Sequence, residues 1–115
     1  METLDYQDIS IKLAPMLDAL SHPARLQIVL HLAKYNGCPA GSISDRLPLS
    51  KSTVSQHLAK LKEAGIIRSI PDGQCQRYSL NETTIAELNE CYHSLITTIN
   101  ELSKTKIDCP GSCNC

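Results

Sequence analysis

The 115-residue chain has no tryptophan or phenylalanine and only four tyrosines, so its core has to be built from Leu, Ile, Val and Ala. It also lacks any apolar run near the roughly 18 residues that span a membrane. The first residues, METLDYQD, do not have the basic-then-apolar order of a secretory signal. We therefore expect a small, mainly helical, cytoplasmic domain that does not enter a membrane.

Signatures of catalysis are missing as well. The sequence has no Cys-x-x-Cys beside a βαβ pattern, no phosphate-binding glycine loop and no evident carboxylate pair placed in a pocket. We expect neither an enzyme nor a resident cofactor. In a reducing compartment the six cysteines are not expected to form a disulfide framework, which leaves metal or redox chemistry for some of them.

The net charge is only −1, but the charges are unevenly distributed. Residues 46–78 hold six basic and two acidic residues, a net +4, whereas the remainder holds five basic and ten acidic residues, a net −5. A basic middle third within an acidic chain indicates a face that meets an anion such as nucleic acid, although such a patch also occurs on proteins that bind none.

Helix signals cover the N-terminal half of the chain. A first helix that ends before Ser-His-Pro is predicted by apolar residues at helical spacing: Ile9, Leu13, Met16, Leu17 and Leu20. Ser21 is expected to cap a second helix that ends at Asn-Gly-Cys-Pro. Its expected buried face comprises Leu26, Val29, Leu30 and Ala33. Ser42 is expected to cap a short third helix that Pro48 ends.

The segment LSKSTVSQHLAKLKEAGII predicts a fourth helix capped by Ser50. Val54, Leu58 and Leu61 fall on one side of it and would pack inward. The opposite side is polar and basic and is formed by Lys51, Ser52, Thr53, Ser55, Gln56 and Lys60. Such side chains bond base edges and phosphate oxygens, so the third and fourth helices together predict a helix-turn-helix. A solvated amphipathic helix would show the same polar face.

Two short segments after this helix, GIIRSI and QRYSL, read as strands, and PDGQC between them has the chemistry of a hairpin turn. A recognition-type helix followed by a β-hairpin is a winged helix. From about Leu17 to Leu80 the sequence resembles the ArsR/SmtB transcriptional repressors, above all in LDALSHPARLQIVLHL, STVSQHLAKLKEAGI and DGQCQRYSL. We therefore expect a mainly α fold with a small β-hairpin wing, a winged helix-turn-helix.

The resemblance implies contacts with double-stranded DNA. The reading surface would be formed by Ser52, Thr53, Ser55, Gln56 and His57, and Arg77 of the wing would lie near the DNA backbone or the minor groove. His57 has a competing role, because in the family motif this histidine more often braces the fold than touches bases.

The last helix, after the expected N-cap Asn81, carries a heptad pattern. Its apolar residues are spaced by 3, 4, 3, 4 and 3 positions: Ile85, Leu88, Tyr92, Leu95, Ile99 and Leu102. Such a seam needs a partner, so we expect a homodimer through the first and last helices. It would bind an inverted-repeat operator with half-site centres about 34–36 Å apart. Alternatively, the last helix covers the core of its own domain.

Two metal sites that the resemblance would suggest are missing. Sensors of this family often carry Cys-x-Cys ahead of the recognition helix, or Asp and His ligands on the last helix. Residues 39–47 contain no cysteine, and the last helix offers only Cys91, His93 and scattered Glu. We expect Cys38 to be an ordinary small buried residue. Cys75 is expected to be exposed in the wing, and Cys91 to be partly buried beside the heptad seam.

The C-terminal stretch CPGSCNC gathers three thiols. Pro110 and Gly111 favour a type II turn that carries Cys113 toward Cys109, and Cys115 follows two residues later. Three thiols suit a soft, three-coordinate centre, whereas structural zinc takes four ligands. Since arsenite and antimonite bind three thiolates in a pyramid, we expect one of them to bind Cys109, Cys113 and Cys115 and to release a repressor from its operator.

The expected organisation is a winged-helix and dimerisation domain, residues 1–104, followed by a flexible cysteine-rich tail, residues 105–115. Cys91 is a further candidate ligand. Two alternatives stay open. A thiol-redox or persulfide sensor of the same fold would join two cysteines in a disulfide or sulfur bridge. A metal-sequestering thiol protein would bind metal without affecting any DNA complex.

Overall fold

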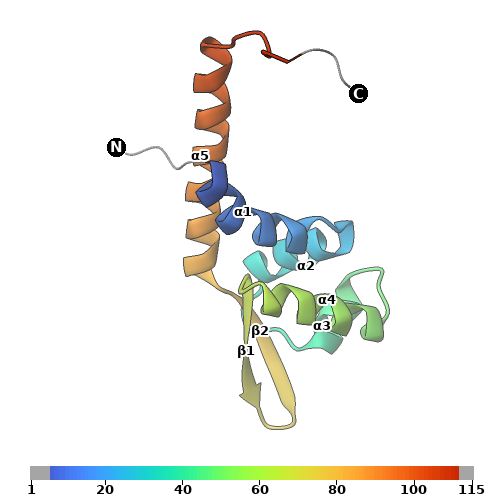
Figure 1. Ribbon diagram of the computed structural model, residues 1–115. Coiled ribbons are helices and arrows are strands. Elements are labelled where there is room, and N and C mark those ends of the chain that lie inside the picture. The colour runs from blue at the N-terminus through green and yellow to red at the C-terminus, as the bar shows by residue number, and fades with distance from the viewer. Residues whose placement is uncertain (1–5, 112–115) are drawn as a thin grey trace.

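The computed structural model describes residues 6–111. The elements in chain order are α1 (Tyr6–Leu20), α2 (Pro23–Lys34), α3 (Ala40–Arg46), α4 (Lys51–Glu63), β1 (Ile67–Asp72), β2 (Cys75–Leu80) and α5 (Glu82–Lys104). Figure 1 shows α2, α3 and α4 gathered beside α1, with the hairpin projecting from them and α5 extending well past α1. These helices and the antiparallel hairpin form the winged helix-turn-helix that the sequence predicts.

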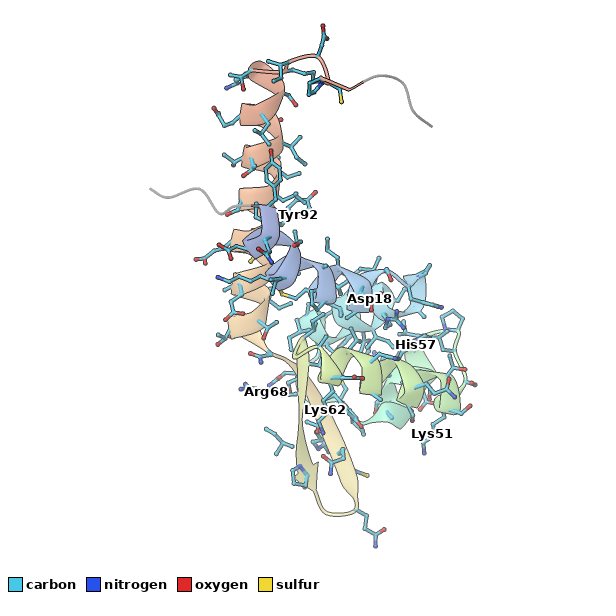
Figure 2. All side chains as sticks on the ribbon, in the orientation of Figure 1. Asp18, Lys51, His57, Lys62, Arg68 and Tyr92 are labelled. Atoms are coloured by element: carbon cyan, nitrogen blue, oxygen red, sulfur yellow. The ribbon has the colours of Figure 1, made fainter. Side chains whose placement is uncertain are left out.

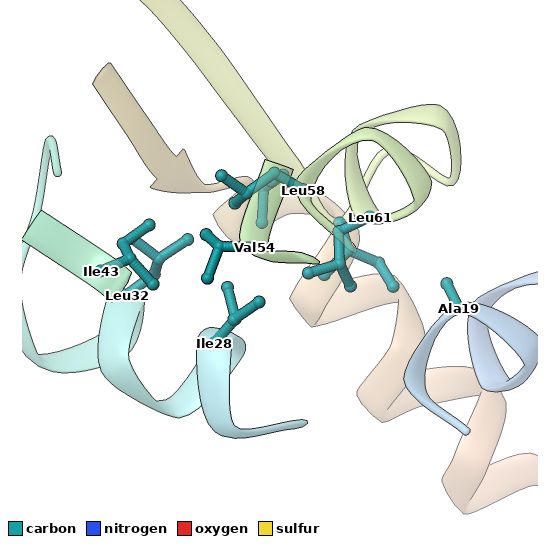
Figure 3. Packing of buried hydrophobic residues seen from close by; sticks show 9 residues of the cluster. Ala19, Ile28, Leu32, Ile43, Val54, Leu58 and Leu61 are labelled. Atoms are coloured by element: carbon teal, nitrogen blue, oxygen red, sulfur yellow. The ribbon is translucent and has the colours of Figure 1, made fainter. Parts of the chain in front are cut away.

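The main core lies where α2, α3 and α4 meet the base of the hairpin. It consists of Ala19, Ile28, Leu32, Ile43, Val54, Leu58, Leu61, Ile66 and Ile67. Figure 3 shows the α4 side chains Val54, Leu58 and Leu61 in this core beside Ile28 of α2. The predicted inward face of α4 is therefore confirmed, and its burial fixes which side of α4 meets the core.

A second cluster joins α1 to α5. Ile9, Leu13 and Met16 of α1 are buried against Cys91, and Leu88 and Leu95 pack around them. Part of α5 therefore covers its own chain, while the helix continues to Lys104 beyond this contact. Within residues 6–111, no helix is both long and apolar enough to cross a membrane.

The expected buried face of α2 is wrong. Three of its four residues are exposed instead: Leu26 (46%), Leu30 (70%) and Ala33. The buried residues of α2 follow one another at four-residue intervals: Ala24, Ile28 and Leu32. Because apolar residues occur on nearly every side of this helix, their spacing alone did not identify the side that meets α4 and β2.

Two of the expected helix caps are confirmed. The Ser50 side chain accepts the backbone N–H of Thr53 at 3.3 Å at the start of α4. The Asn81 side chain accepts the N–H of Thr84 at 3.4 Å at the start of α5. Each cap supplies a partner to a backbone donor that the first turn of a helix leaves without one.

The other two expected caps are wrong. Nδ1 of His22 caps α2 by accepting the N–H of Ala24 at 3.1 Å, while the hydroxyl of Ser21 donates to the carbonyl of Asp18. Ser42 lies inside α3, which begins directly after Pro39. Pro39 is the N-cap residue, and its carbonyl accepts the N–H of Ser42 at 3.1 Å and that of Ile43 at 3.3 Å, so α3 starts earlier than the serine suggested.

The hairpin turn is shorter than the sequence suggested. The register pairs Ile67 with Leu80 at the base and Asp72 with Cys75 at the tip, leaving only two residues in the turn. Gly73, at the first of these positions, has φ +62°, and a type II′ turn requires such a positive φ at its first central residue. The two strands therefore run to the very end of the wing.

Candidate nucleic-acid interface

α3 and α4 form the helix-turn-helix. The turn between them is tight, since the N–H of Leu49 donates to the carbonyl of Leu47 at 2.7 Å. Ile43 of α3 and Val54 of α4 are both fully buried in the core that the two helices share. Because the inner face of α4 is fixed, its outer face is presented to solvent in a defined orientation.

Most of the predicted DNA-binding residues of α4 lie on this outer face. The exposed members are Lys51, Ser52, Ser55, Gln56 and Lys60. Figure 2 shows Lys51 at one end of α4 and Lys62 toward the other. Amide and hydroxyl groups between flanking lysines are the combination that reads base edges while holding phosphates. Thr53 differs, because it is half-buried and its hydroxyl accepts a hydrogen bond from Ser50 at 2.7 Å.

His57 is half-buried and faces α2 rather than the solvent side of α4. The centroid of its ring lies 4.5 Å from that of His22, and its Nδ1 lies 3.4 Å from Nη1 of Arg25. Desolvation lowers the pKa of His57, and the neighbouring His22 and Arg25 lower it further. This position favours the bracing role of His57 over a contact with bases.

Arg25 is a residue that the sequence reasoning missed. Its Nε donates to the carbonyl of Ala19 at 2.6 Å, and its Nη2 donates to the carbonyl of Asp18 at 3.4 Å. Both carbonyls belong to the last turn of α1, where they lack partners within the helix. The sequence signal that could have identified Arg25 is its place five residues after the end of α1, where an arginine can donate to the free carbonyls. Arg25 therefore links the end of α1 to α4 through His57.

Arg77 of the wing is bound within the protein. Its Nε donates to Oδ2 of Asp72 at 2.6 Å, and its Nη1 donates to the carbonyl of Gly37 at 2.8 Å. The hydrogen bond and the charge of Asp72 raise the pKa of Arg77 above its usual range. The side chain is half exposed. Its contact with DNA stays a prediction.

The other basic residues of segment 46–78 lie in two kinds of environment. The guanidinium of Arg46 lies over the ring of Tyr35, with 4.6 Å between its Cζ and the ring centroid. The exposed remainder lies on α4 and β1 and comprises Lys51, Lys60, Lys62 and Arg68. The basic surface therefore follows the recognition helix to the base of the wing.

The predicted dimer seam divides into two parts. Ile85, Leu88 and Leu95 are half-buried against the cores of their own chain. The remaining three are about half exposed: Tyr92 (49%), Ile99 (48%) and Leu102 (47%). The last two line an apolar groove of about 340 Å³ between α1 and α5, with Tyr6 and Leu17 on its α1 side. Homodimerisation through this surface stays a prediction.

The described cysteines are scattered. Cys38 is half-buried, Cys75 and Cys109 are exposed and Cys91 is buried. Within residues 6–111 no group of three or more Cys, His, Asp or Glu could hold a metal ion. Cys113 and Cys115 lie outside the described residues, so the predicted tail site is untested.

Cys91 does not lie near the end of α5. It is 8% exposed and packs against α1, thirteen residues before Lys104. At 1.5 Å per residue this corresponds to about 20 Å along the helix axis. Within one chain, Cys91 can therefore join Cys109 only if the tail folds back along α5.

Comparisons with known proteins agree with this geometry. Residues 20–70 match a family described as a helix-turn-helix domain. The chain is 33% identical to the transcriptional activator HlyU of Vibrio cholerae over 101 residues, which cover 88% of this chain and 93% of HlyU. It is 36% identical to the HTH-type regulator YgaV of Escherichia coli over 89 residues, 77% of this chain and 83% of YgaV. These relatives are regulators, and the chain is not an enzyme.

Solved structures give the same result. An ArsR-like transcriptional regulator from Rhodococcus sp. RHA1 superposes with a TM-score of 0.68 at 29% identity, over 83% of this chain and 86% of that one. Reduced HlyU from Vibrio cholerae superposes with a TM-score of 0.63 at 32% identity, over 76% of this chain and 92% of that one. A possible transcriptional regulator for arsenical resistance superposes with a TM-score of 0.64 at 27% identity, over 80% of this chain and 96% of that one.

Proposed function

Because this chain belongs to the ArsR/SmtB family of winged helix-turn-helix transcriptional regulators, we propose that it is a homodimeric repressor of inverted-repeat operators in double-stranded DNA. The outer face of α4 carries the proposal. Core packing fixes one side of this helix, and the opposite side presents Gln56 and Ser55 between Lys51 and Lys60. In the major groove the amide of Gln56 would bond an adenine edge, and the lysines would contact phosphates.

Dimerisation would follow from the apolar groove between α1 and α5. Ile99 and Leu102 are about half exposed there, and a second copy of the chain would cover them. A two-fold dimer sets two α4 helices into successive major grooves, about 34–36 Å apart. The proposed operator is therefore palindromic.

The signal we propose is arsenite or antimonite bound by Cys109, Cys113 and Cys115. Cys109 supports this assignment, because it is exposed beyond the end of α5 and accessible to a ligand. The structural similarity to a possible regulator for arsenical resistance is a second support. Release requires that the metalloid bind the DNA-free state more tightly than the DNA-bound state.

A thiol-redox or persulfide signal is the second candidate. Two of the described thiols, Cys75 and Cys109, are exposed, and Cys75 lies at the tip of the wing. Among the structural neighbours, one structure is of HlyU in a reduced form. Under this alternative an oxidant or a persulfide donor would release DNA without any metalloid.

The test begins with selection of operators from a random duplex library by the full-length reduced protein. We expect an inverted repeat, a stoichiometry of one dimer per site in sedimentation, and an affinity that falls steeply as the salt concentration rises. Selection of no preferred sequence, or binding of one protomer per site, would overturn the proposed repressor.

Arsenite, antimonite, peroxide and a persulfide donor are then added separately to the operator complex, with zinc as a control. Release by arsenite or antimonite alone supports the metalloid signal, and release by peroxide or persulfide alone replaces it with the redox signal. Tight arsenite binding that leaves the DNA complex intact would indicate a metal-sequestering protein instead.

A further inference from the structure

An aspartate at the tip of the wing is unexpected on a surface that meets DNA. Asp72 is exposed and pairs with Cys75 at the last position of the hairpin. A carboxylate there repels phosphates, so charge alone would weaken DNA binding. Its neighbour explains its presence, because Oδ2 of Asp72 accepts the Nε–H of Arg77 at 2.6 Å.

Arg77 connects three parts of the chain. Its Nε reaches Asp72 on β1 across the hairpin, and its Nη1 donates to the carbonyl of Gly37 at 2.8 Å. Gly37 belongs to the turn between α2 and α3, 40 residues away in sequence. One guanidinium therefore ties the outer part of the wing to the body of the domain.

The backbone makes a second link at the same place. The N–H of Cys38 donates to the carbonyl of Tyr78 at 3.0 Å, and the N–H of Tyr78 donates to the carbonyl of Cys38 at 2.8 Å. These two bonds add the α2–α3 turn to the free edge of β2, next to the bond from Arg77. The wing is thus anchored at its middle on one edge.

The anchor matters because the wing has little else to hold it. Residues 70–77 are all exposed, and a two-stranded hairpin without a buried face is marginally stable by itself. The orientation of the outer wing relative to α4 then depends on contacts at its inner edge. The guanidinium of Arg77 provides such a contact, because it bridges the Asp72 carboxylate of the outer wing and the Gly37 carbonyl of the domain body.

We propose that Arg77 and Asp72 are positioning residues, which hold the wing at the angle needed for DNA binding, and that Arg77 acts through this geometry rather than by contacting a phosphate. The inference rests on the proposed function, because it assigns a role within DNA binding. It differs from the expectation drawn from the sequence, in which Arg77 itself meets the DNA.

The two roles predict opposite signs for Asp72→Asn. If Arg77 were a phosphate contact, removal of the neighbouring carboxylate would release it and remove a repulsive charge, and operator affinity would rise. If the pair positions the wing, the same substitution weakens operator binding by about threefold to tenfold, because a neutral amide oxygen replaces the charged carboxylate as the acceptor of Arg77 and the hydrogen bond loses about half of its strength. Asp72→Glu, which keeps the carboxylate, should recover part of the loss.

Arg77→Lys provides an independent test. Lysine keeps the positive charge and would serve as a phosphate contact, but one ammonium does not reproduce the two diverging N–H groups that reach Asp72 and Gly37. We expect Arg77→Lys and Arg77→Ala to weaken operator binding to a similar extent. The slope of log affinity against log salt should be unchanged in both, whereas loss of a phosphate contact in Arg77→Ala would reduce it by about one.

Hydrogen exchange tests the anchor without DNA. In the free protein, the amides of Cys38 and Tyr78 should exchange at least about threefold faster in Arg77→Ala and Asp72→Asn than in the wild type. The exchange rates of the amides at the base of the hairpin should not change. Unchanged exchange at Cys38 and Tyr78, or higher operator affinity in Asp72→Asn, would overturn the proposal. A wild-type protein that binds no operator would overturn the proposed function instead, and exchange would still decide whether the anchor exists.

Discussion

Nη1 of Arg25 lies 3.4 Å from Nδ1 of His57, and this contact joins the first turn of α2 to the recognition helix. Arginine is always a donor, so His57 accepts with Nδ1 and carries no proton there. Nδ1 of His22 is used in the same way, because it accepts the N–H of Ala24. Both contacts therefore require the lone pair of an Nδ1 atom that holds no proton.

The first prediction concerns pH. Desolvation, and then His22 and Arg25, lower the pKa of His57 from its ordinary value of 6.5. Below that value the unfolded chain binds a proton that the folded chain still excludes, so the free energy of unfolding decreases as the pH falls. The stabilisation is complete above about pH 6.5 and is lost as the pH falls through the lower pKa of the folded state. Urea unfolding at a series of pH values measures it.

His57→Gln is the matched variant for this prediction. The amide oxygen of glutamine can accept from Arg25 at any pH, so part of the acid destabilisation should disappear. The rest is expected from His31, whose pKa is lowered by desolvation and by Arg46. An unchanged pH profile in His57→Gln would contradict the role given to the Arg25 contact.

The second prediction separates reading from anchoring on α4. Gln56→Ala should reduce the preference for the operator over random DNA, by about 1–3 kcal/mol if the amide makes a bidentate contact. Lys60→Ala should weaken binding to both DNAs about equally and reduce the salt slope by about one. Fluorescence anisotropy with both duplexes at several salt concentrations measures these effects. If Lys60→Ala reduced the preference for the operator and Gln56→Ala weakened binding to both DNAs equally, Lys60 would be the base-reading residue and Gln56 the phosphate contact.

The third prediction concerns the dimer. Ile99→Glu places a charge in the apolar groove between α1 and α5, so it should shift the protein toward the monomer and weaken operator binding. Ile107→Glu is the control, because Ile107 is 85% exposed beyond the end of α5. Sedimentation equilibrium gives the oligomeric state. A dimer that survives Ile99→Glu at unchanged affinity would place the interface elsewhere.

How far the sequence predicts this fold is clear from two helices. On α4 the only large apolar residues are Val54, Leu58 and Leu61, so their spacing identified the buried face. On α2 apolar residues crowd the whole circumference, and Leu30, expected inside, is 70% exposed. The elements that pack against such a helix decide which side of it is buried, and the spacing of its own apolar residues does not identify those elements.

The corrected face of α2 gives the fourth prediction. Ile28→Ala should lower the free energy of unfolding by about 2–5 kcal/mol, because Ile28 is fully buried and its loss leaves a cavity. Leu30→Ala on the same helix should change it by less than about 0.5 kcal/mol. Chemical denaturation of the two variants compares them directly. Equal losses would restore the original expectation for this helix.

The site was predictable only in part, for a related reason. The reading face of α4 follows from local spacing, since its residues are neighbours on one helix. The contacts of Arg25 with His57 and of Arg77 with Gly37 span 32 and 40 residues. Such pairs come together only when three or more elements have packed, and no local pattern indicates them.

Cys109 lies on a part of the chain that neither hydrophobic core uses. Cys109 is exposed, and residues 105–111 are exposed throughout. Serine differs from cysteine by one atom and does not bind arsenite as a thiolate does. Substitution there should therefore leave both folding and operator affinity nearly unchanged.

The last prediction follows from this separation. Replacement of Cys109, Cys113 and Cys115 together by Ser should abolish release of the operator by arsenite, while unfolding and operator binding stay as in the wild type. Each single replacement should weaken the response strongly, because a two-thiol site loses one of three As–S bonds and much of the chelate. Cys75→Ser is the control and should respond as the wild type does. If the triple variant still leaves DNA when arsenite is added, the metalloid binds elsewhere, with Cys38 and Cys91 the next residues to replace.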